Sequence, residues 1–211
     1  MKKLSLALVA LMGLSGVAEA HQAGDFFMRA GTATVRPSAS SDNVLGMGEF
    51  NIDNNTQLGL TFDYMVTDNI GIELLAATPF RHKVGLGPTG KLATVRQLPP
   101  TLMAQWYFGD ATSKLRPYVG AGINYTMFFD NKFNDTGKGA GLSNLSVKNS
   151  WGAAGQVGMD YMLDKDWMLN MSVWYINIDT KVKFDSATAG RQSIDTKINP
   201  WVFMFGAGYT F

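Results

Sequence analysis

The chain ends in the stretch PWVFMFGAGYTF, residues 200–211. Every second residue from Trp201 to Phe211 is apolar, and five of these six are aromatic, whereas the residues between them are small or mixed and end in a threonine. A period of two predicts a β-strand, because successive side chains of a strand point to opposite faces. So aromatic a face must be covered by something other than water. The rest of the sequence indicates what covers it.

Seven other segments alternate in the same way. In the segment before the last one, for example, Leu169 and Met171 alternate with Asn170 and Ser172. The eight predicted strands cover residues 26–35, 56–66, 70–78, 101–108, 118–127, 151–163, 167–179 and 200–211. Strands of about 9–11 residues are what a tilted barrel needs to cross the hydrocarbon layer of a membrane.

The connections between these strands alternate in length. Three are short and rich in turn-forming residues, and four are longer and polar. The short ones are residues 67–69, 109–116 and 164–166, and the long ones are 36–55, 80–98, 128–150 and 181–197. This plan predicts an all-β fold, namely an eight-stranded antiparallel up-and-down transmembrane β-barrel with short periplasmic turns and four long extracellular loops.

Aromatic residues gather at the ends of the predicted strands, as they do at the two interfaces of a membrane. Those near the short turns are Tyr64, Trp106, Phe108, Tyr161, Trp167, Tyr209 and Phe211, and those near the long connections are Phe129, Trp151 and Trp201. A soluble β-sandwich has no reason to sort its aromatic residues in this way. The pattern therefore favours the membrane barrel over a soluble β protein.

The first twenty residues have the pattern of a secretory signal peptide. Lys2 and Lys3 precede an apolar run, and Ala18-Glu19-Ala20 has the small-x-small pattern of a cleavage site. We therefore expect a signal peptide at 1–20 and an exported barrel at 21–211, integral to the bacterial outer membrane. Without that segment, the 18 basic and 17 acidic residues fall to 16 of each. A net charge near zero argues against nucleic acid as a partner.

Two stretches have the spacing of ligand-binding motifs but lack their chemistry. Residues 85–91 have the spacing of a P-loop, yet Leu92 stands where a serine or threonine holds Mg²⁺. Residues 130–135 have the start of a calcium loop, yet Lys132 occupies a ligand position. Both stretches are expected to be surface loops, and no metal site is predicted.

Candidate catalytic residues are scarce. The chain has no cysteine, and His82 is the only plausible general base, without a serine and carboxylate to complete a triad. We therefore expect no enzyme activity, no catalytic residue and no cofactor. Because Arg81 and Lys83 flank His82, this stretch instead suits a polar surface near anionic lipid headgroups.

The residues that face the lumen of such a barrel fall into two zones by height. Near the short turns they are polar: Arg29, Asp63, Glu73, Gln105, Gln156, Asp160 and Asn170. Towards the long connections they are apolar: Leu75, Met103, Trp174, Ile176, Ile178, Val202 and Met204. An eight-stranded barrel holds only side chains or one small ligand. The lower zone therefore predicts a hydrogen-bonded plug, and the upper zone is either ordinary packing or an apolar pocket open to the outside.

Three prolines flank the third and fourth predicted strands on the side of the long connections. Pro79 ends the third strand, and Pro99 and Pro100 precede the fourth. Because proline donates no hydrogen bond to a β-ladder, this strand pair is expected to be loosened there. A lateral gap at this point would let an apolar solute leave the upper lumen for the membrane without crossing the plug. The alternative is that the prolines merely end the strands.

Long stretches of the chain resemble the OmpW family of small outer-membrane proteins. They are FFMRAGTATVRP (26–37), NNTQLGLTFDYMVTDNIGIELLAATPFRHK (54–83), LPPTLMAQWYFGD (98–110), RPYVGAGINYTMFFD (116–130), SWGAAGQVGMDYM (150–162) and NPWVFMFGAGYTF (199–211). The resemblance implies an eight-stranded barrel with a role in the uptake of small hydrophobic compounds, and it favours the pocket over ordinary packing. It also implies a receptor that a bacteriocin exploits, and a terminal strand that the barrel-assembly machinery recognises.

The leading hypothesis is a passive carrier that takes a small hydrophobic solute from outside into the outer membrane, with outer-membrane lipids around it. One alternative is a surface-display or envelope-stability protein that a bacteriocin or phage uses as a receptor. Another alternative is a narrow ion channel.

Overall fold

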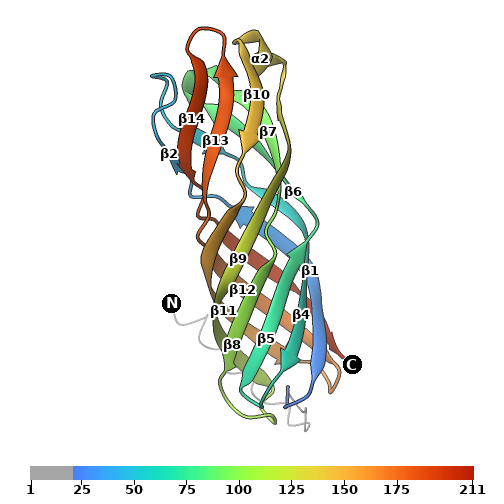
Figure 1. Cartoon of the computed structure of the whole chain (residues 1–211). Helices are drawn as coiled ribbons and strands as arrows, with labels where there is room; N and C mark the ends of the chain where they lie inside the picture. Colours follow the sequence, from blue (N-terminus) through green and yellow to red (C-terminus); the bar gives the residue numbers. More distant parts are fainter. Residues whose placement is uncertain (1–20) are drawn as a thin grey trace, which may run out of the picture.

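The computed structural model describes residues 21–211, so the predicted signal peptide lies outside the described residues. Eight antiparallel strands form a closed barrel, as Figure 1 shows. They are β1 (Phe26–Arg36), β4 (Asn55–Met65), β5 (Ile70–Ala77), β8 (Thr101–Tyr107), β9 (Leu115–Phe133), β11 (Ser150–Met162), β12 (Trp167–Ile176) and β15 (Trp201–Thr210). Pairing of β1 with β15 joins the two ends of the chain into one wall. The predicted all-β eight-stranded barrel is confirmed.

Side chains of the barrel strands alternate between the lumen and the outside. On β15, Val202 and Met204 are buried, whereas Trp201, Phe203 and Phe205 are exposed. The aromatic face of the last strand therefore points away from the barrel. Contact with lipid covers such a face without a second protein layer.

The periplasmic end is closed by short turns and by Arg116 of β9. The guanidinium of Arg116 donates to the carbonyl oxygens of His21, Asp68 and Phe108 at 3.0, 2.7 and 2.9 Å. One side chain thus ties together the N-terminal segment and two turns. In the third turn, the carboxylate of Asp164 accepts hydrogen bonds from two backbone amides, which is the usual way in which aspartate stabilises a turn.

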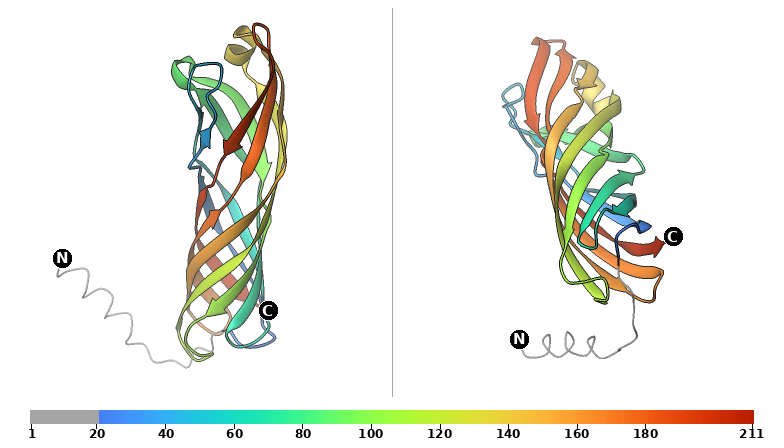
Figure 2. Two further views of the ribbon diagram at one scale, coloured as in Figure 1. Left: turned by 60° about the vertical axis from the view of Figure 1, so that its left-hand side comes forward. Right: turned by 60° about the horizontal axis from the view of Figure 1, so that its bottom comes forward.

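The four long connections are largely strands, which differs from the loops expected of them. They contain β2 (Ser40–Ser41), β3 (Phe50–Ile52), β6 (Phe80–Leu86), β7 (Lys91–Leu98), β10 (Leu142–Val147), β13 (Asp179–Ser186) and β14 (Gly190–Lys197). With the upper part of β9, these strands continue the wall of the barrel upward, as both views in Figure 2 show. We call this part the upper wall.

The strands of the upper wall have few apolar residues because water, and not lipid, covers their outer face. On β13, Phe184 is buried, while Lys181 and Lys183 point outward and are exposed. Along these strands, charged residues therefore alternate with small residues or with isolated apolar ones. Such a pattern predicts a strand only weakly. Helix within residues 21–211 is limited to α2 (Asp135–Gly139) and the 3₁₀ turn η2 (Gly87–Thr89). Neither these nor any other described helix is long and apolar enough to cross a membrane.

Candidate functional site

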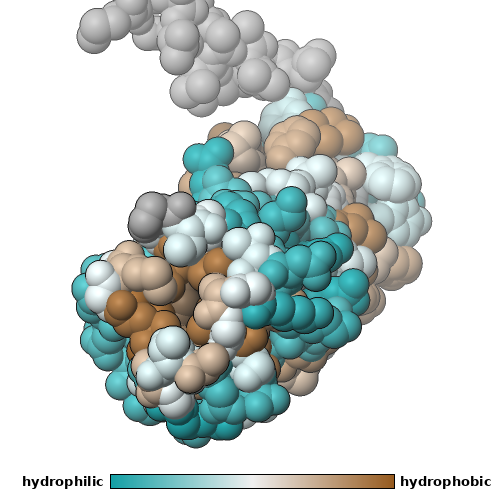
Figure 3. Space-filling view, turned by 90° about the horizontal axis from the view of Figure 1, so that it is seen from above, coloured by the Kyte–Doolittle hydropathy of each residue, from teal (hydrophilic) through white to brown (hydrophobic). Residues whose placement is uncertain are grey.

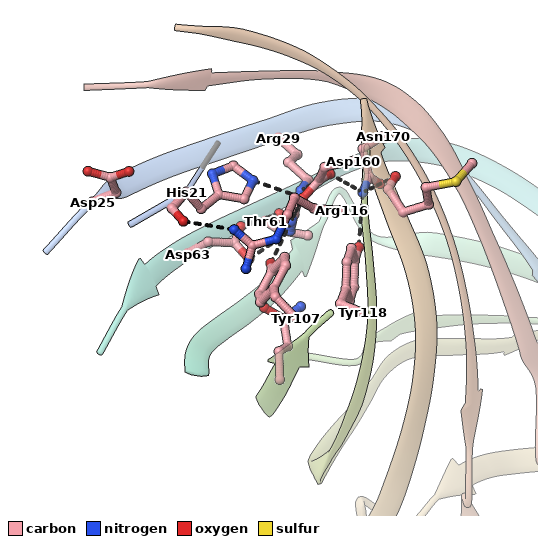
Figure 4. A network of polar contacts seen from close by, with 12 residues as sticks. His21, Asp25, Arg29, Thr61, Asp63, Tyr107, Arg116, Tyr118, Asp160 and Asn170 are labelled. Carbon is pink, nitrogen blue, oxygen red and sulfur yellow. Dashed lines mark hydrogen bonds and ion pairs between the residues drawn. The ribbon is translucent and has the colours of Figure 1, made fainter. Parts of the chain in front are cut away.

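The seven lumen residues predicted for the lower zone are all buried and belong to one polar network. Figure 4 shows the part of this network around Arg29, Asp63, Asp160 and Asn170. Arg29 of β1 lies at its centre. Its guanidinium contacts Asp160 of β11 at 2.5 Å, Asp63 of β4 at 2.7 Å and Glu73 of β5 at 2.9 Å. One cation thus holds carboxylates from three strands, and this arrangement crosses the lumen.

Amides complete the network around these charges. Gln156 donates to Glu73 at 2.8 Å and accepts from Gln105 at 3.1 Å. Asn170 donates to Asp160 at 2.8 Å. All these side chains are nearly inaccessible to solvent, so a solute that passed between them would have to break hydrogen bonds that nothing else replaces.

The network also contains residues that the sequence analysis did not assign. The Tyr107 hydroxyl accepts from Arg29 at 2.8 Å and donates to Gln105 at 2.9 Å, and the Tyr118 hydroxyl accepts from Asn170 at 2.9 Å. Tyr107 occupies the lumen parity of its predicted strand, so its role was detectable from the alternation. Tyr118 has the same parity as Arg116 in β9.

His21 could not be found in that way, because it precedes the first strand. Its Nε2 lies 3.0 Å from Asp160, and its ring stacks on Phe27 with centroids 3.9 Å apart. The N-terminal segment therefore closes the network from the periplasmic side.

The seven residues predicted for the upper zone form one buried apolar cluster directly above this network. Leu75, Met103, Trp174, Ile176, Ile178, Val202 and Met204 pack together with Phe80, Ala33, Val35, Ala154 and Ile198. Ile178 belongs to the connection after β12 and not to a barrel strand, which ends at Ile176. The indole nitrogen of Trp174 is buried without a hydrogen-bond partner among the described residues.

An apolar cavity lies above this cluster, inside the upper wall. The space between its atoms is about 790 Å³, counting the part that is open to solvent. Residues from seven strands of the upper wall, the upper part of β9 included, and from the segment after β2 line it, among them Val44, Phe50, Leu86, Phe133, Leu142 and Phe184. Seen from above in Figure 3, hydrophobic residues line the hollow, residues of intermediate hydropathy surround it, and hydrophilic residues lie farther out.

None of the seven predicted pocket residues lines this cavity. The cavity and the cluster are nevertheless contiguous, because Ile52, Phe128 and Ile198 belong to both. In the structure, the seven residues form the packed floor beneath the cavity.

One polar pair interrupts the cavity wall. His82 Nδ1 lies 2.7 Å from the carbonyl oxygen of Asp53, and His82 Nε2 lies 3.0 Å from the amide nitrogen of Gln97. Because a carbonyl only accepts, Nδ1 carries the proton, and Nε2 accepts from Gln97. Burial lowers the pKa of His82, and the hydrogen bond to Asp53 offsets this in part. The ring is therefore neutral at pH 7.

The β-ladder is interrupted where the three prolines lie. The β5–β8 ladder ends at the pair Leu75 and Thr101, and the β6–β7 ladder begins at the pair Phe80 and Gln97. The prolines Pro79, Pro99 and Pro100 all fall in the interval between these two pairs. We call this interval the ladder break.

Side chains of β9 and β8 form hydrogen bonds along the β8 edge of the ladder break. The Asn124 amide donates to the carbonyl oxygen of Pro100 at 3.1 Å and to the Thr101 hydroxyl at 2.9 Å. Thr126 in turn donates to Asn124 at 2.6 Å. These three side chains are buried. They supply hydrogen bonds at a point where the prolines cannot donate any.

Comparison with known proteins assigns the chain to a family. The model of the OmpW family matches residues 22–211. Outer membrane protein W of Escherichia coli K12 is 65% identical over 213 aligned residues, which cover both chains completely. Outer membrane protein AlkL of Ectopseudomonas oleovorans is 34% identical over 169 residues, 77% of this chain and 69% of that one.

A solved structure agrees with these relationships. The crystal structure of the outer membrane protein OprG from Pseudomonas aeruginosa superposes with a TM-score of 0.86 at 44% identity, over 92% of this chain and 99% of that one. The barrel, the family match and the named relatives lead to one conclusion. The chain belongs to the OmpW family and is a barrel protein of the outer membrane.

Proposed function

We propose that the barrel takes small hydrophobic molecules from outside and releases them sideways into the outer membrane. The observation that carries this proposal is a vertical order. An apolar cavity open above rests on an apolar cluster, and both lie above a polar network that fills the lumen. An apolar solute that enters from above therefore meets favourable surroundings until it reaches the network.

The network makes straight passage into the periplasm unfavourable. A solute at this level would separate Arg29 from Asp63 or Asp160, leaving a buried charge without its partner, and this costs several kcal/mol. The same reasoning argues against a narrow ion channel, because the side chains that cross the lumen are bonded to one another.

The ladder break offers the way out. Leu75 and Phe80 of the apolar cluster flank this interval of the wall, and Met103 lies two residues below it. A solute that leaves the cluster here reaches the hydrocarbon layer without contacting the network. Because Met103 and Met204 have flexible side chains, they can shift to make room in a cluster that is otherwise packed. The three prolines and the seven apolar residues thus keep the roles that the sequence suggested, as a proposal.

A substitution that fills the cavity tests the proposal. Ala93 is buried and lines the cavity, so A93F should obstruct it. Ser193 points outward from β14, so S193F adds the same ring outside and serves as the control. With both variants in proteoliposomes, uptake of a labelled apolar solute should fall roughly tenfold in A93F, which corresponds to ~1.4 kcal/mol, and stay unchanged in S193F.

Equal uptake in A93F and the unaltered protein would contradict the carrier. The surface-display alternative would then take its place, because a protein that only presents its outer surface does not need the cavity.

A further inference from the structure

The outer face of the upper wall carries four cations on three neighbouring strands. Arg81 of β6 and Arg96 of β7 lie directly opposite each other, and one step higher Lys83 of β6 lies opposite Thr94 of β7. Thr94 in turn lies opposite Lys132 of β9. All four cationic side chains are exposed. We call Arg81, Lys83, Arg96 and Lys132 the basic patch.

The outward direction of these side chains follows from the strand alternation. His82 of β6 and Val95 of β7 are cross-strand partners between the two rows, and both are buried and line the cavity. The wall therefore separates an apolar interior from a cationic exterior. The basic patch is accordingly no part of the cavity.

The positive charge of the patch is not balanced. Asp130 accepts from Lys132 and lies 3.3 Å from Arg96, and its hydrogen bond with Lys132 lowers its pKa, so that it is ionised at neutral pH. Among residues 21–211, neither Arg81 nor Lys83 forms an ion pair. One carboxylate thus faces four cations.

The neighbouring carboxylate of Asp53 does not change this balance, because it pairs with Lys91. Like charges directly opposite each other on a sheet destabilise it. An arrangement such as Arg81 opposite Arg96 is therefore best explained by an anion that comes from outside the chain.

The height of the patch indicates where that anion lies. Phe129 of β9 is the cross-strand partner of Arg96 and is 38% exposed. It stands on the outer face just above the aromatic pairs that end the apolar surface of the barrel, such as Tyr125 with Trp151, whose ring centroids are 4.6 Å apart. Aromatic residues of this kind mark the level of the lipid headgroups. The basic patch begins in the same row as Phe129, at the outer surface of the membrane.

The β13–β14 part of the upper wall differs from the basic patch in its balance of charges. On β13 and β14, Lys181 pairs with Asp195 at 2.6 Å, and Lys197 lies opposite Asp179. On these two strands three carboxylates face four cations, so the charges nearly cancel. The uncompensated charge is therefore a property of the β6–β7–β9 face and not of the rim as a whole.

We propose that the basic patch binds the phosphate of a phosphorylated glycolipid in the outer leaflet of the outer membrane. Arginine presents a planar fork of donors that matches phosphate oxygens, and two arginines side by side hold one phosphate between them. Lys83 and Lys132 reach the same group or a second phosphate from the row above. This binding is independent of the proposed transport, because it uses the outer face of the wall.

Purified protein in detergent micelles, titrated with bis-phosphorylated lipid A, tests the proposal. In R81Q/R96Q, two charge-assisted contacts to the phosphate are lost, so the affinity should fall by tenfold or more. The matched control K181Q/K197Q removes two cations from the balanced face and should bind lipid A as the unaltered protein does. Should R81Q/R96Q fail to fold, K83Q/K132Q in the same titration should show a loss of the same kind.

Two further ligands separate phosphate recognition from its alternatives. Lipid A without phosphates should bind about tenfold more weakly than the phosphorylated lipid. Inorganic phosphate should show no saturable binding at millimolar concentration. The proposal is overturned if R81Q/R96Q keeps its affinity, if both forms of lipid A bind equally, or if inorganic phosphate binds as well as the lipid and thus identifies an adventitious ion only.

Discussion

At the scale of single residues, the polar network depends on Arg29, which compensates three carboxylates in the lumen. R29M removes this cation and leaves Asp63, Glu73 and Asp160 to repel one another. We expect a loss of ~3–5 kcal/mol in the free energy of unfolding, measured by urea titration of the refolded barrel. The control R36M removes an exposed arginine that lies over the Phe203 ring, and it should cost no more than ~1 kcal/mol. A small effect of R29M, similar to that of R36M, would show that the network does not depend on this charge.

His82 supplies a prediction on pH. Burial lowers its pKa in the folded protein below the ordinary value of about 6.5. The neutral ring therefore favours the folded, solute-binding state above about pH 6.5, and this contribution is lost as the pH falls through the lowered pKa. Since a charged ring in an apolar wall is unfavourable for an apolar solute, affinity for such a solute should drop at acid pH.

A titration of solute affinity against pH checks this expectation. In H82Q the acid-induced drop should disappear, because glutamine does not titrate. A drop of the same size in H82Q would assign the pH dependence to another group.

At the scale of strands, the side chain of Asn124 fastens the β8 edge of the ladder break to β9, beside one backbone hydrogen bond. In N124A the carbonyl oxygen of Pro100 loses one donor and keeps the bond from the Tyr125 amide at 3.1 Å. We expect faster hydrogen exchange of the Tyr125 amide, by roughly 5- to 150-fold for ~1–3 kcal/mol, together with faster release of solute into lipid. In the control N199G, where Asn199 has φ 37° and bonds to the Ile178 amide, exchange should rise at Ile178 only. Unchanged exchange at Tyr125 in N124A would mean that Asn124 does not hold the break.

The eight barrel strands could be predicted from the sequence, because lipid outside and a filled lumen inside impose alternation with large apolar residues. The upper strands could not, since water on their outer face allows residues such as Lys181 and Asp185 there. The lower network could be predicted because its polar residues lie on the lumen face of the barrel strands. The cavity could not be predicted, because it lies within the upper strands. Its walls come from residues such as Leu86 and Phe184, which stood in stretches that looked like loops. The role of His21 could not be predicted, because His21 lies outside a strand, where no alternation of residues indicates which side chains face the lumen.

At the scale of the whole molecule, the barrel has three levels with different chemistry. A polar network seals the periplasmic end, an apolar cluster lies above it, and an apolar cavity opens at the top. The two apolar levels adjoin the ladder break, where backbone pairing between neighbouring strands is interrupted. Entry from outside and lateral exit into the membrane is the route that this order favours.

The most direct test of this account is a crystal structure of the protein with a brominated apolar solute, because bromine scatters anomalously far more strongly near its absorption edge than any atom of the chain does. The account predicts peaks in the cavity beside Phe50 and Phe184, and peaks near Trp174 or at the ladder break beside Pro100. It predicts none between Arg29 and the periplasmic turns. Bromine below Arg29, or bromine bound only to the lipid-facing surface while the lumen stays empty, would contradict the account.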